Sequence, residues 1–185
     1  MRVISGEYGG RKLKAVPGTN TRPTTDKIKE SIFNIIGPYF DGGTCLDLFA
    51  GSGSLSIEAV SRGFNQAILI DKEPIALKTI KENIAMTKEE DKFKVYRNDA
   101  DRALDVLSRQ TQKFDLIFMD PPYLKQEIEK QLLKMADLGL VAENGKIICE
   151  VDKKSDLSDE VGPFYAVRRE NYGITQIVIY QFKEG

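Results

Sequence analysis

Residues 46–59 read LDLFAGSGSLSIEA, an apolar strand that runs into a Gly-x-Gly bend and opens a helix. From Cys45 onward, short apolar runs alternate with segments whose apolar residues recur at a spacing near 3.6. This alternation is typical of βαβ units and predicts an α/β fold with a mostly parallel sheet. The predicted strands are TCLDLF (44–49), QAILID (66–71), FKVYRN (93–98), FDLIFMD (114–120) and KIICEV (146–151).

The rest of the chain completes this plan. Helices are predicted between the strands, around residues 55–60, 76–84, 103–107 and 128–135. YAVRRENYG (165–173) and ITQIVIYQF (174–182) predict an antiparallel hairpin that closes the sheet edge, which brings the expected sheet to seven strands. We expect one domain over 1–185: a basic N-terminal hairpin extension (1–22) turning at Gly9-Gly10, a leading amphipathic helix segment (23–43) and the α/β core (44–185).

Composition narrows the function classes. With 41% apolar residues and 27 basic against 28 acidic side chains, a membrane protein and a disordered chain are both excluded. The chain has no histidine, which removes imidazole-based triads and histidine metal sites, and no metal is expected. The two cysteines lie in apolar runs and favour buried thiols. Without a signal-like apolar stretch, we expect a cytoplasmic protein with no membrane contact.

The charges are unevenly distributed along the chain. Residues 1–38 carry seven Lys or Arg against three acids, a balance of +4, so the remainder carries −5. The split predicts a basic segment that meets a polyanion, attached to a body with a different role.

The Gly-x-Gly bend predicts a cofactor site. Gly51 and Gly53 permit positive φ and close approach of a ligand, and Asp71 lies 20 residues beyond Gly51, where a carboxylate can bind ribose hydroxyls. Ser56 stands where a dinucleotide fingerprint has its third glycine, and Asp47 disfavours a pyrophosphate. A cofactor with an ammonium and a sulfonium, S-adenosylmethionine, fits better. The alternative is that the tripeptide is only a tight turn.

A second motif, DPPY (120–123), follows the strand 114–120 and is predicted to face the same crevice. The Asp120 carboxylate and the Pro121 carbonyl can both accept hydrogen bonds from an exocyclic NH2 group, and Tyr123 can stack on the base. The alternative is a rigid loop with a turn-forming Asp. Asp99 could accept from the adenine amino group while the Ala100 amide contacts the ring, or Asp99 is an ordinary helix cap.

These residues resemble a class I S-adenosylmethionine-dependent methyltransferase, whose fold is Rossmann-like. The segments ISGEYGGRKLKAVPG (4–18), RPTTDKIKESIFNII (22–36), LDLFAGSG (46–53), DPPY (120–123) and YGITQIVIY (172–180) stand in the order seen in the bacterial family that methylates guanine N2 in 16S ribosomal RNA. The resemblance covers nearly the whole chain. It departs at KIKE (27–30), where the family more often has arginines, which bears on how RNA phosphates are held.

The resemblance implies roles for individual residues and partners. Asp47 would bind the methionine amino group, Asp71 the ribose and Asp99 with Ala100 the adenine, while the segment with Phe49, Gly51 and Gly53 lines the cofactor. Asp120, Pro121 and Tyr123 would hold and orient the guanine. RNA phosphates would meet Arg11, Lys12, Lys14 and Arg22. The implied partner is 16S rRNA, expected within a small-subunit ribosomal particle, and a monomer is expected.

Three rival functions stay open on sequence grounds. A DNA adenine-N6 methyltransferase also uses DPPY, but 185 residues leave little room for a target-recognition region. In protein-glutamine methyltransferases the related loop begins with Asn, whereas this loop begins with Asp120. A non-catalytic RNA-binding protein with the same fold is the third possibility.

Overall fold

The structure, a computed structural model, describes residues 1–18, 24–122 and 126–184. Two predicted site residues, Arg22 and Tyr123, therefore lie outside the described residues. The elements in chain order are α1 (Asp26–Ile36), β1 (Thr44–Asp47), α2 (Ser54–Ser61), β2 (Gln66–Asp71), α3 (Pro74–Thr87), the short helix η1 (Glu90–Lys92), β3 (Phe93–Arg97), α4 (Ala100–Ser108), β4 (Phe114–Met119), α5 (Ile128–Asp137), β5 (Val141–Asp152), β6 (Glu160–Val161), β7 (Phe164–Tyr172) and β8 (Thr175–Phe182).

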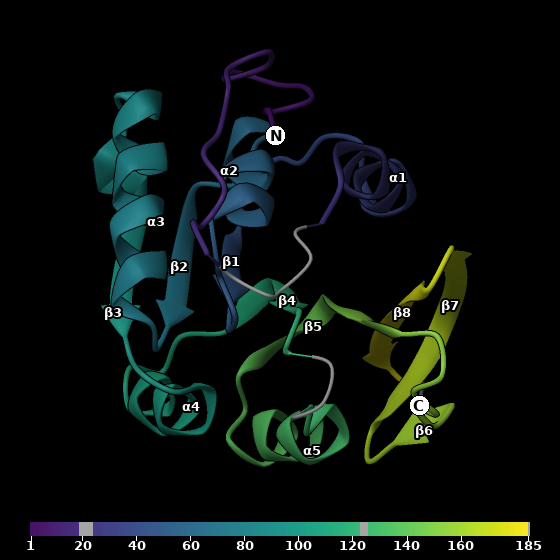
Figure 1. The fold of residues 1–185 in the computed structure, drawn as a ribbon. Helices are drawn as coiled ribbons and strands as arrows, with labels where there is room; N and C mark the ends of the chain where they lie inside the picture. Colours follow the sequence, from purple (N-terminus) through teal and green to yellow (C-terminus); the bar gives the residue numbers. More distant parts are fainter. Residues whose placement is uncertain (19–23, 123–125, 185) are drawn as a thin grey trace.

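One sheet, in the order β3-β2-β1-β4-β5-β8-β7-β6, organises the molecule (Figure 1). The five strands from β3 to β5 pair in parallel, as the βαβ pattern predicts, and β8 pairs antiparallel with both β5 and β7. The predicted α/β fold is confirmed. Within the described residues the sheet has eight strands rather than seven, because the two-residue strand β6 pairs with β7.

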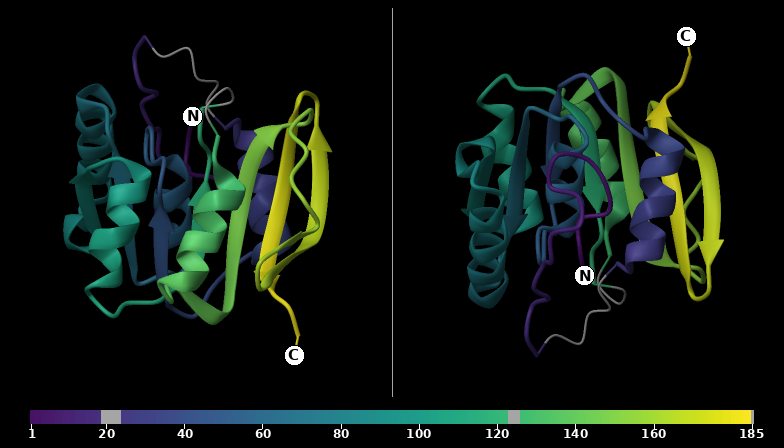
Figure 2. Two further views of the ribbon diagram at one scale, coloured as in Figure 1. Left: turned by 90° about the horizontal axis from the view of Figure 1, so that it is seen from below. Right: turned by 90° about the horizontal axis from the view of Figure 1, so that it is seen from above.

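Helices cover both faces of the sheet and divide the core in two (Figures 1 and 2). One hydrophobic cluster packs α4 and α5 against the sheet, with residues such as Leu104 and Leu132 fully buried. The other cluster lies beneath α1, α2 and α3, with Phe33, Ile57 and Ile80 fully buried. Because strand residues alternate between faces, this second face receives every other residue of each strand.

The N-terminal segment packs on the body of the protein. Arg2 and Lys12 form one isolated antiparallel bridge, so the expected hairpin is an irregular loop closed at its base. Val3, Tyr8 and Leu13 are buried against the cluster of α1–α3, and Tyr8 donates its hydroxyl hydrogen to Glu89 at 2.9 Å. The apolar residues of the segment thus pack it on the body of the protein. The charge balance of residues 1–38 gave no indication of this packing.

A buried ionic network joins this segment to α1 and α2. Lys29, with no exposed surface, donates to the Arg2 carbonyl at 2.6 Å and lies 3.5 Å from Glu58. Glu58 in turn accepts from the Ile4 amide at 2.8 Å and from Arg62 at 2.7 Å. Lys29 is therefore an interior residue of α1 and does not bear on phosphate contact, whereas Lys27 of the same stretch is exposed.

Across the described ranges, no helix combines the length and apolar character that crossing a bilayer requires.

Candidate active site

The Gly-x-Gly bend connects β1 to α2 through two left-handed residues. Gly51 has φ 57° and Gly53 has φ 83°, conformations that glycine adopts without a steric penalty. A Cβ added at Gly51 would meet nothing within 4 Å, whereas one at Gly53 would lie 3.3 Å from the Leu69 side chain. The space in front of Gly51 is therefore open to a ligand, and Gly53 packs against the sheet.

Asp47 ends β1 with a carboxyl group that is 1% exposed. Ser56, at the position of the missing third glycine, donates to Asp47 Oδ2 at 3.2 Å, and the Phe49 amide donates to Oδ1 at 3.4 Å. Burial raises the pKa of Asp47 to about 7, and the charge of Asp71 contributes to the rise. A cationic group that reaches Asp47 would stabilise its ionised form.

Asp71 ends β2 and fixes the shape of the bend. Its Oδ2 accepts from the Gly51 amide at 2.9 Å and its Oδ1 from the Glu73 amide at 2.9 Å. Each carboxylate oxygen can accept more than one hydrogen bond, so both retain capacity for ligand hydroxyls. Gly51 and Asp71, which the sequence assigned to one cofactor site, are thus also in direct contact with each other.

Asp99 is the N-cap of α4, where its carboxylate accepts from the Arg102 amide at 3.0 Å. The capping role that the sequence left open is present, and the role toward adenine stays a prediction. Ala100 is buried at the first position of α4, and Phe49 is half-buried against the cluster of α4 and α5.

Asp120 and Pro121 follow β4, the neighbour of β1. The parallel register sets Asp47 opposite Phe118, so Asp120 lies two residues further along, at the same carboxyl edge. Cys45 and Phe118 both pack in the cluster beneath α1–α3, and by alternation Asp47 and Asp120 point to that same face. Pro121 is buried. The structure thus brings the glycine bend and the start of the DPPY motif together.

A carboxyl residue at this edge, Glu150, was not predicted from the sequence. Glu150 on β5 is 5% exposed, and Thr24, just before α1, donates its hydroxyl hydrogen to Glu150 Oε2 at 2.5 Å. Loss of water and the nearby charge of Glu150 raise the pKa of Asp120 well above its usual range. The available signal was an acidic residue inside the apolar run KIICEV, which a buried strand accepts only with a partner.

The predicted phosphate-binding residues have mixed surroundings. Arg11 donates to the carbonyls of Met86 and Thr87 at the end of α3, at 3.0 and 3.4 Å. Lys14 forms an exposed ion pair with Glu82 at 3.2 Å. Lys12 is exposed. Contact of any of these side chains with RNA stays a prediction.

Asn83 on α3 links the N-terminal segment to the bend. Its side chain accepts from the Lys14 amide at 2.8 Å and donates to the Ser52 carbonyl at 2.8 Å. The polar chain Lys14–Asn83–Ser52 therefore connects the segment proposed to meet RNA with the loop proposed to hold a cofactor.

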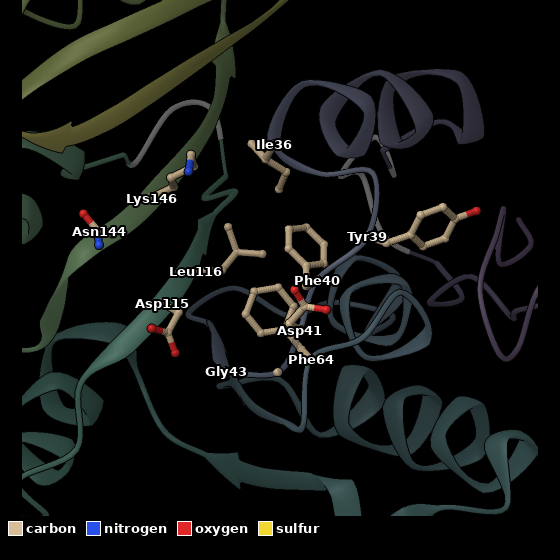
Figure 3. A pocket seen from close by; sticks show the side chains of 11 residues that line it. Ile36, Tyr39, Phe40, Asp41, Gly43, Phe64, Asp115, Leu116, Asn144 and Lys146 are labelled. Carbon is tan, nitrogen blue, oxygen red and sulfur yellow. The ribbon is translucent and has the colours of Figure 1, made fainter.

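A groove of about 520 Å³ lies at the opposite end of the sheet (Figure 3). Gly43 precedes β1 and Asp115 lies near the start of β4, so the groove is at the amino edge of the parallel strands. The Phe40 and Phe64 rings form its apolar floor, 4.6 Å apart between centroids. Because ligands of such sheets bind at the carboxyl edge, this groove is separate from the candidate site.

Comparison with known proteins places the chain among close relatives. The sequence profile of the family described as conserved hypothetical protein 95 matches residues 1–181. YlbH of Bacillus subtilis, whose name assigns it provisionally to the rRNA methyltransferases, is 50% identical over 181 residues, 98% of each chain. Ribosomal RNA small subunit methyltransferase D of Escherichia coli is 32% identical over 157 residues, 85% of this chain and 77% of that protein. A conserved hypothetical protein of Streptococcus pyogenes has a solved structure with TM-score 0.80 and 42% identity, covering 84% of this chain and 95% of that one.

Proposed function

The chain belongs to the conserved hypothetical protein 95 family, and from this premise we propose that it methylates the exocyclic N2 amine of a guanine in 16S ribosomal RNA, using S-adenosylmethionine. The observation that carries the proposal is that the glycine bend and the start of the DPPY motif lie at the same edge of the sheet and on the same face. The glycine bend after β1 and the Asp120–Pro121 corner after β4 leave adjacent parallel strands and point to the same side.

The residues at the bend fit this cofactor. Open space in front of Gly51 admits a ligand, and the acidic pair Asp47 and Asp71 suits a molecule with an ammonium and a sulfonium. When bound, S-adenosylmethionine supplies a methyl group on a sulfonium, which is already an activated donor. In the proposal Asp47 binds the methionine amino group and Asp71 binds the ribose, while Asp99 and Ala100 hold the adenine.

The corner after β4 would hold the target amine. The lone pair of an aromatic amine is delocalised into its ring, so the amine is a poor nucleophile. Asp120 and the Pro121 carbonyl accept its two hydrogens and aim the lone pair at the methyl group, and Tyr123 is assigned to stacking on the base. Proximity and orientation then supply most of the acceleration, so no histidine base is needed.

The relatives support RNA of the small ribosomal subunit as the substrate class. The names of the Bacillus and Escherichia proteins specify rRNA and the small-subunit rRNA, respectively. In the proposal the substrate is a small-subunit particle, with Lys12 and Arg22 among the residues that meet RNA phosphates. Such contacts would position the RNA without reading its sequence.

The test is transfer of labelled methyl groups to small subunits, naked rRNA and duplex DNA in parallel, followed by nucleoside analysis. The expected product is N2-methylguanosine from small-subunit RNA. D120A should lower transfer by about 100-fold or more while binding of S-adenosylmethionine persists, and D137A, an exposed Asp at the end of α5, is the matched control. N6-methyladenosine, or label confined to DNA, would overturn the proposal. Failure to bind the cofactor at all would favour a non-catalytic RNA-binding protein.

A further inference from the structure

Glu150 lies beside Asp120 because of the strand register. β4 and β5 run in parallel with Met119 opposite Cys149, so the next residues of the two strands, Asp120 and Glu150, project side by side. Both point to the face covered by α1–α3, since Ile148 and Phe118 pack there two residues earlier. A carboxyl group buried as deeply as that of Glu150 is stable only with hydrogen-bond partners.

Those partners are Thr24 and Asp120. The Thr24 hydroxyl donates to Glu150 Oε2, and the carboxyls of Asp120 and Glu150 are hydrogen-bonded to each other. An ionised carboxylate only accepts hydrogen bonds, so the carboxyl–carboxyl bond requires one shared proton. Burial raises the pKa of Glu150, and the bonds from Thr24 and Asp120 oppose that rise. The shared proton therefore belongs on Asp120 and the negative charge on Glu150.

The groups around the pair reinforce this protonation state. The charge of Asp47 on β1 raises the pKa of Asp120, and the charge of Glu150 raises that of Asp47. Asp71 on β2 faces Asp47 from the other side. Four adjacent strand ends thus carry four carboxyls toward one face, and ionising all of them together is unfavourable.

Resting on the proposed function, we propose that Glu150 is a positioning residue for methyl transfer. Glu150 is held by Thr24 and accepts a hydrogen bond from the Asp120 O–H. This bond directs the other Asp120 oxygen to the target amine. The pair then stores the proton that the reaction releases.

The proposed transfer conserves protons. As the nitrogen–methyl bond forms and the sulfur–methyl bond breaks, the amine nitrogen becomes positively charged. It loses one proton to the free oxygen of Asp120, and Asp120 passes its original proton to Glu150. The pair changes from one proton to two and later returns one to solvent.

The test compares E150Q with E150D in the full chain. E143Q is the control, because Glu143 is an exposed residue of the same strand. The readouts are kcat on small subunits between pH 6 and 9, and affinity for S-adenosylmethionine. In the wild type we expect a bell-shaped profile, whose alkaline limb reports loss of the shared proton.

E150Q removes the partner that makes Asp120 hold a proton. We expect its kcat to fall on the order of 10- to 100-fold and its alkaline limb to disappear, with cofactor affinity within about twofold. E150D should keep the bell shape at reduced kcat, and E143Q should match the wild type. A uniform loss in E150Q at every pH, with the shape unchanged, would reveal a purely structural residue and overturn the proposal. A kcat within twofold of the wild type would overturn it as well.

A second readout does not require turnover. In the free protein, NMR titration of side-chain carboxyl carbons should place the Asp120 transition at higher pH in the wild type than in E150Q, and T24V should raise the transition of Glu150. An Asp120 transition that does not move in E150Q would overturn the pairing. If the wild type binds the cofactor but methylates no RNA, the proposed function fails, while this titration still decides whether Glu150 makes Asp120 hold a proton.

Discussion

The affinity for S-adenosylmethionine should depend on pH through Asp47. With its pKa near 7 in the free protein, this carboxyl is about half ionised at pH 7 and about 3% ionised at pH 5.5. If only the ionised form binds the ammonium of the cofactor, the apparent affinity should fall about 15-fold between these pH values. The range lies below pH 7 because an α-amino group has a pKa near 8 and stays charged there.

Isothermal titration calorimetry measures this dependence directly. At pH 7, binding should release about half a proton per cofactor, detected as a heat that varies with the ionisation enthalpy of the buffer. D47N should bind more weakly at pH 7, by on the order of tenfold, and should show a flat profile below it. D120N controls for a second carboxyl whose pKa is raised, and it should retain the slope. A flat wild-type profile, or an unchanged slope in D47N, would refute the assignment of Asp47 to the amino group.

The same carboxyl should reduce stability at high pH when no cofactor is bound. Because the folded-state pKa of Asp47 lies above its unfolded value near 3.9, the folded state holds the extra proton between these values. The free energy of unfolding should therefore fall as pH rises from about 4 to about 7, and D47N should lack this part of the fall in urea unfolding.

Three further predictions concern the bend, the N-terminal segment and the buried network. G51A should lower the free energy of unfolding by about 1 kcal/mol in urea, because the residue has φ 57°. It should also lower the cofactor affinity measured by calorimetry by about tenfold, because the added methyl group occupies the open space in front of the bend. R11A should lower the free energy of unfolding by about 1 kcal/mol, because Arg11 no longer donates to the Met86 carbonyl at the end of α3. K12A should leave the free energy of unfolding unchanged and reduce the salt dependence of RNA binding. The reverse pattern would contradict the assignment of the two residues. K29M should lower the free energy of unfolding by about 3 kcal/mol, because it leaves Glu58 buried with one cation fewer, and a neutral effect would show that the network does not stabilise the fold.

Much of the fold followed from periodicity alone. Residues 67–70 and 116–119 are continuously apolar, as in a buried strand, and the structure has strands Gln66–Asp71 and Phe114–Met119 there. Strand β6 has two residues and is too short to leave a pattern. The first half of β5 was missed because Glu143, Asn144 and Gly145 interrupt its apolar run.

The site was predicted in part, and the missing part depends on tertiary contacts. The spacing of Gly51 and Asp71 was sufficient to assign both to one site, because strand and turn geometry impose it, and the structure adds the hydrogen bond between them. The partnership of Glu150 with Asp120 depends on how β4 and β5 align, which no local pattern specifies. The buried position of Lys29 likewise depends on a second surface, the N-terminal segment, packing on α1. Amphipathicity reports one buried face and is silent on another.

The place of β8 in the sheet has a consequence for biosynthesis. Because β8 lies between β5 and β7, β5 gains its second neighbour only after residues 175–182 have left the ribosome. Thr24, made early, must wait for Glu150, which lies 126 positions later in the chain. A nascent polypeptide therefore cannot form the contact between Thr24 and Glu150, or complete the pairing of β5, until the segment that ends with β8 has left the ribosome.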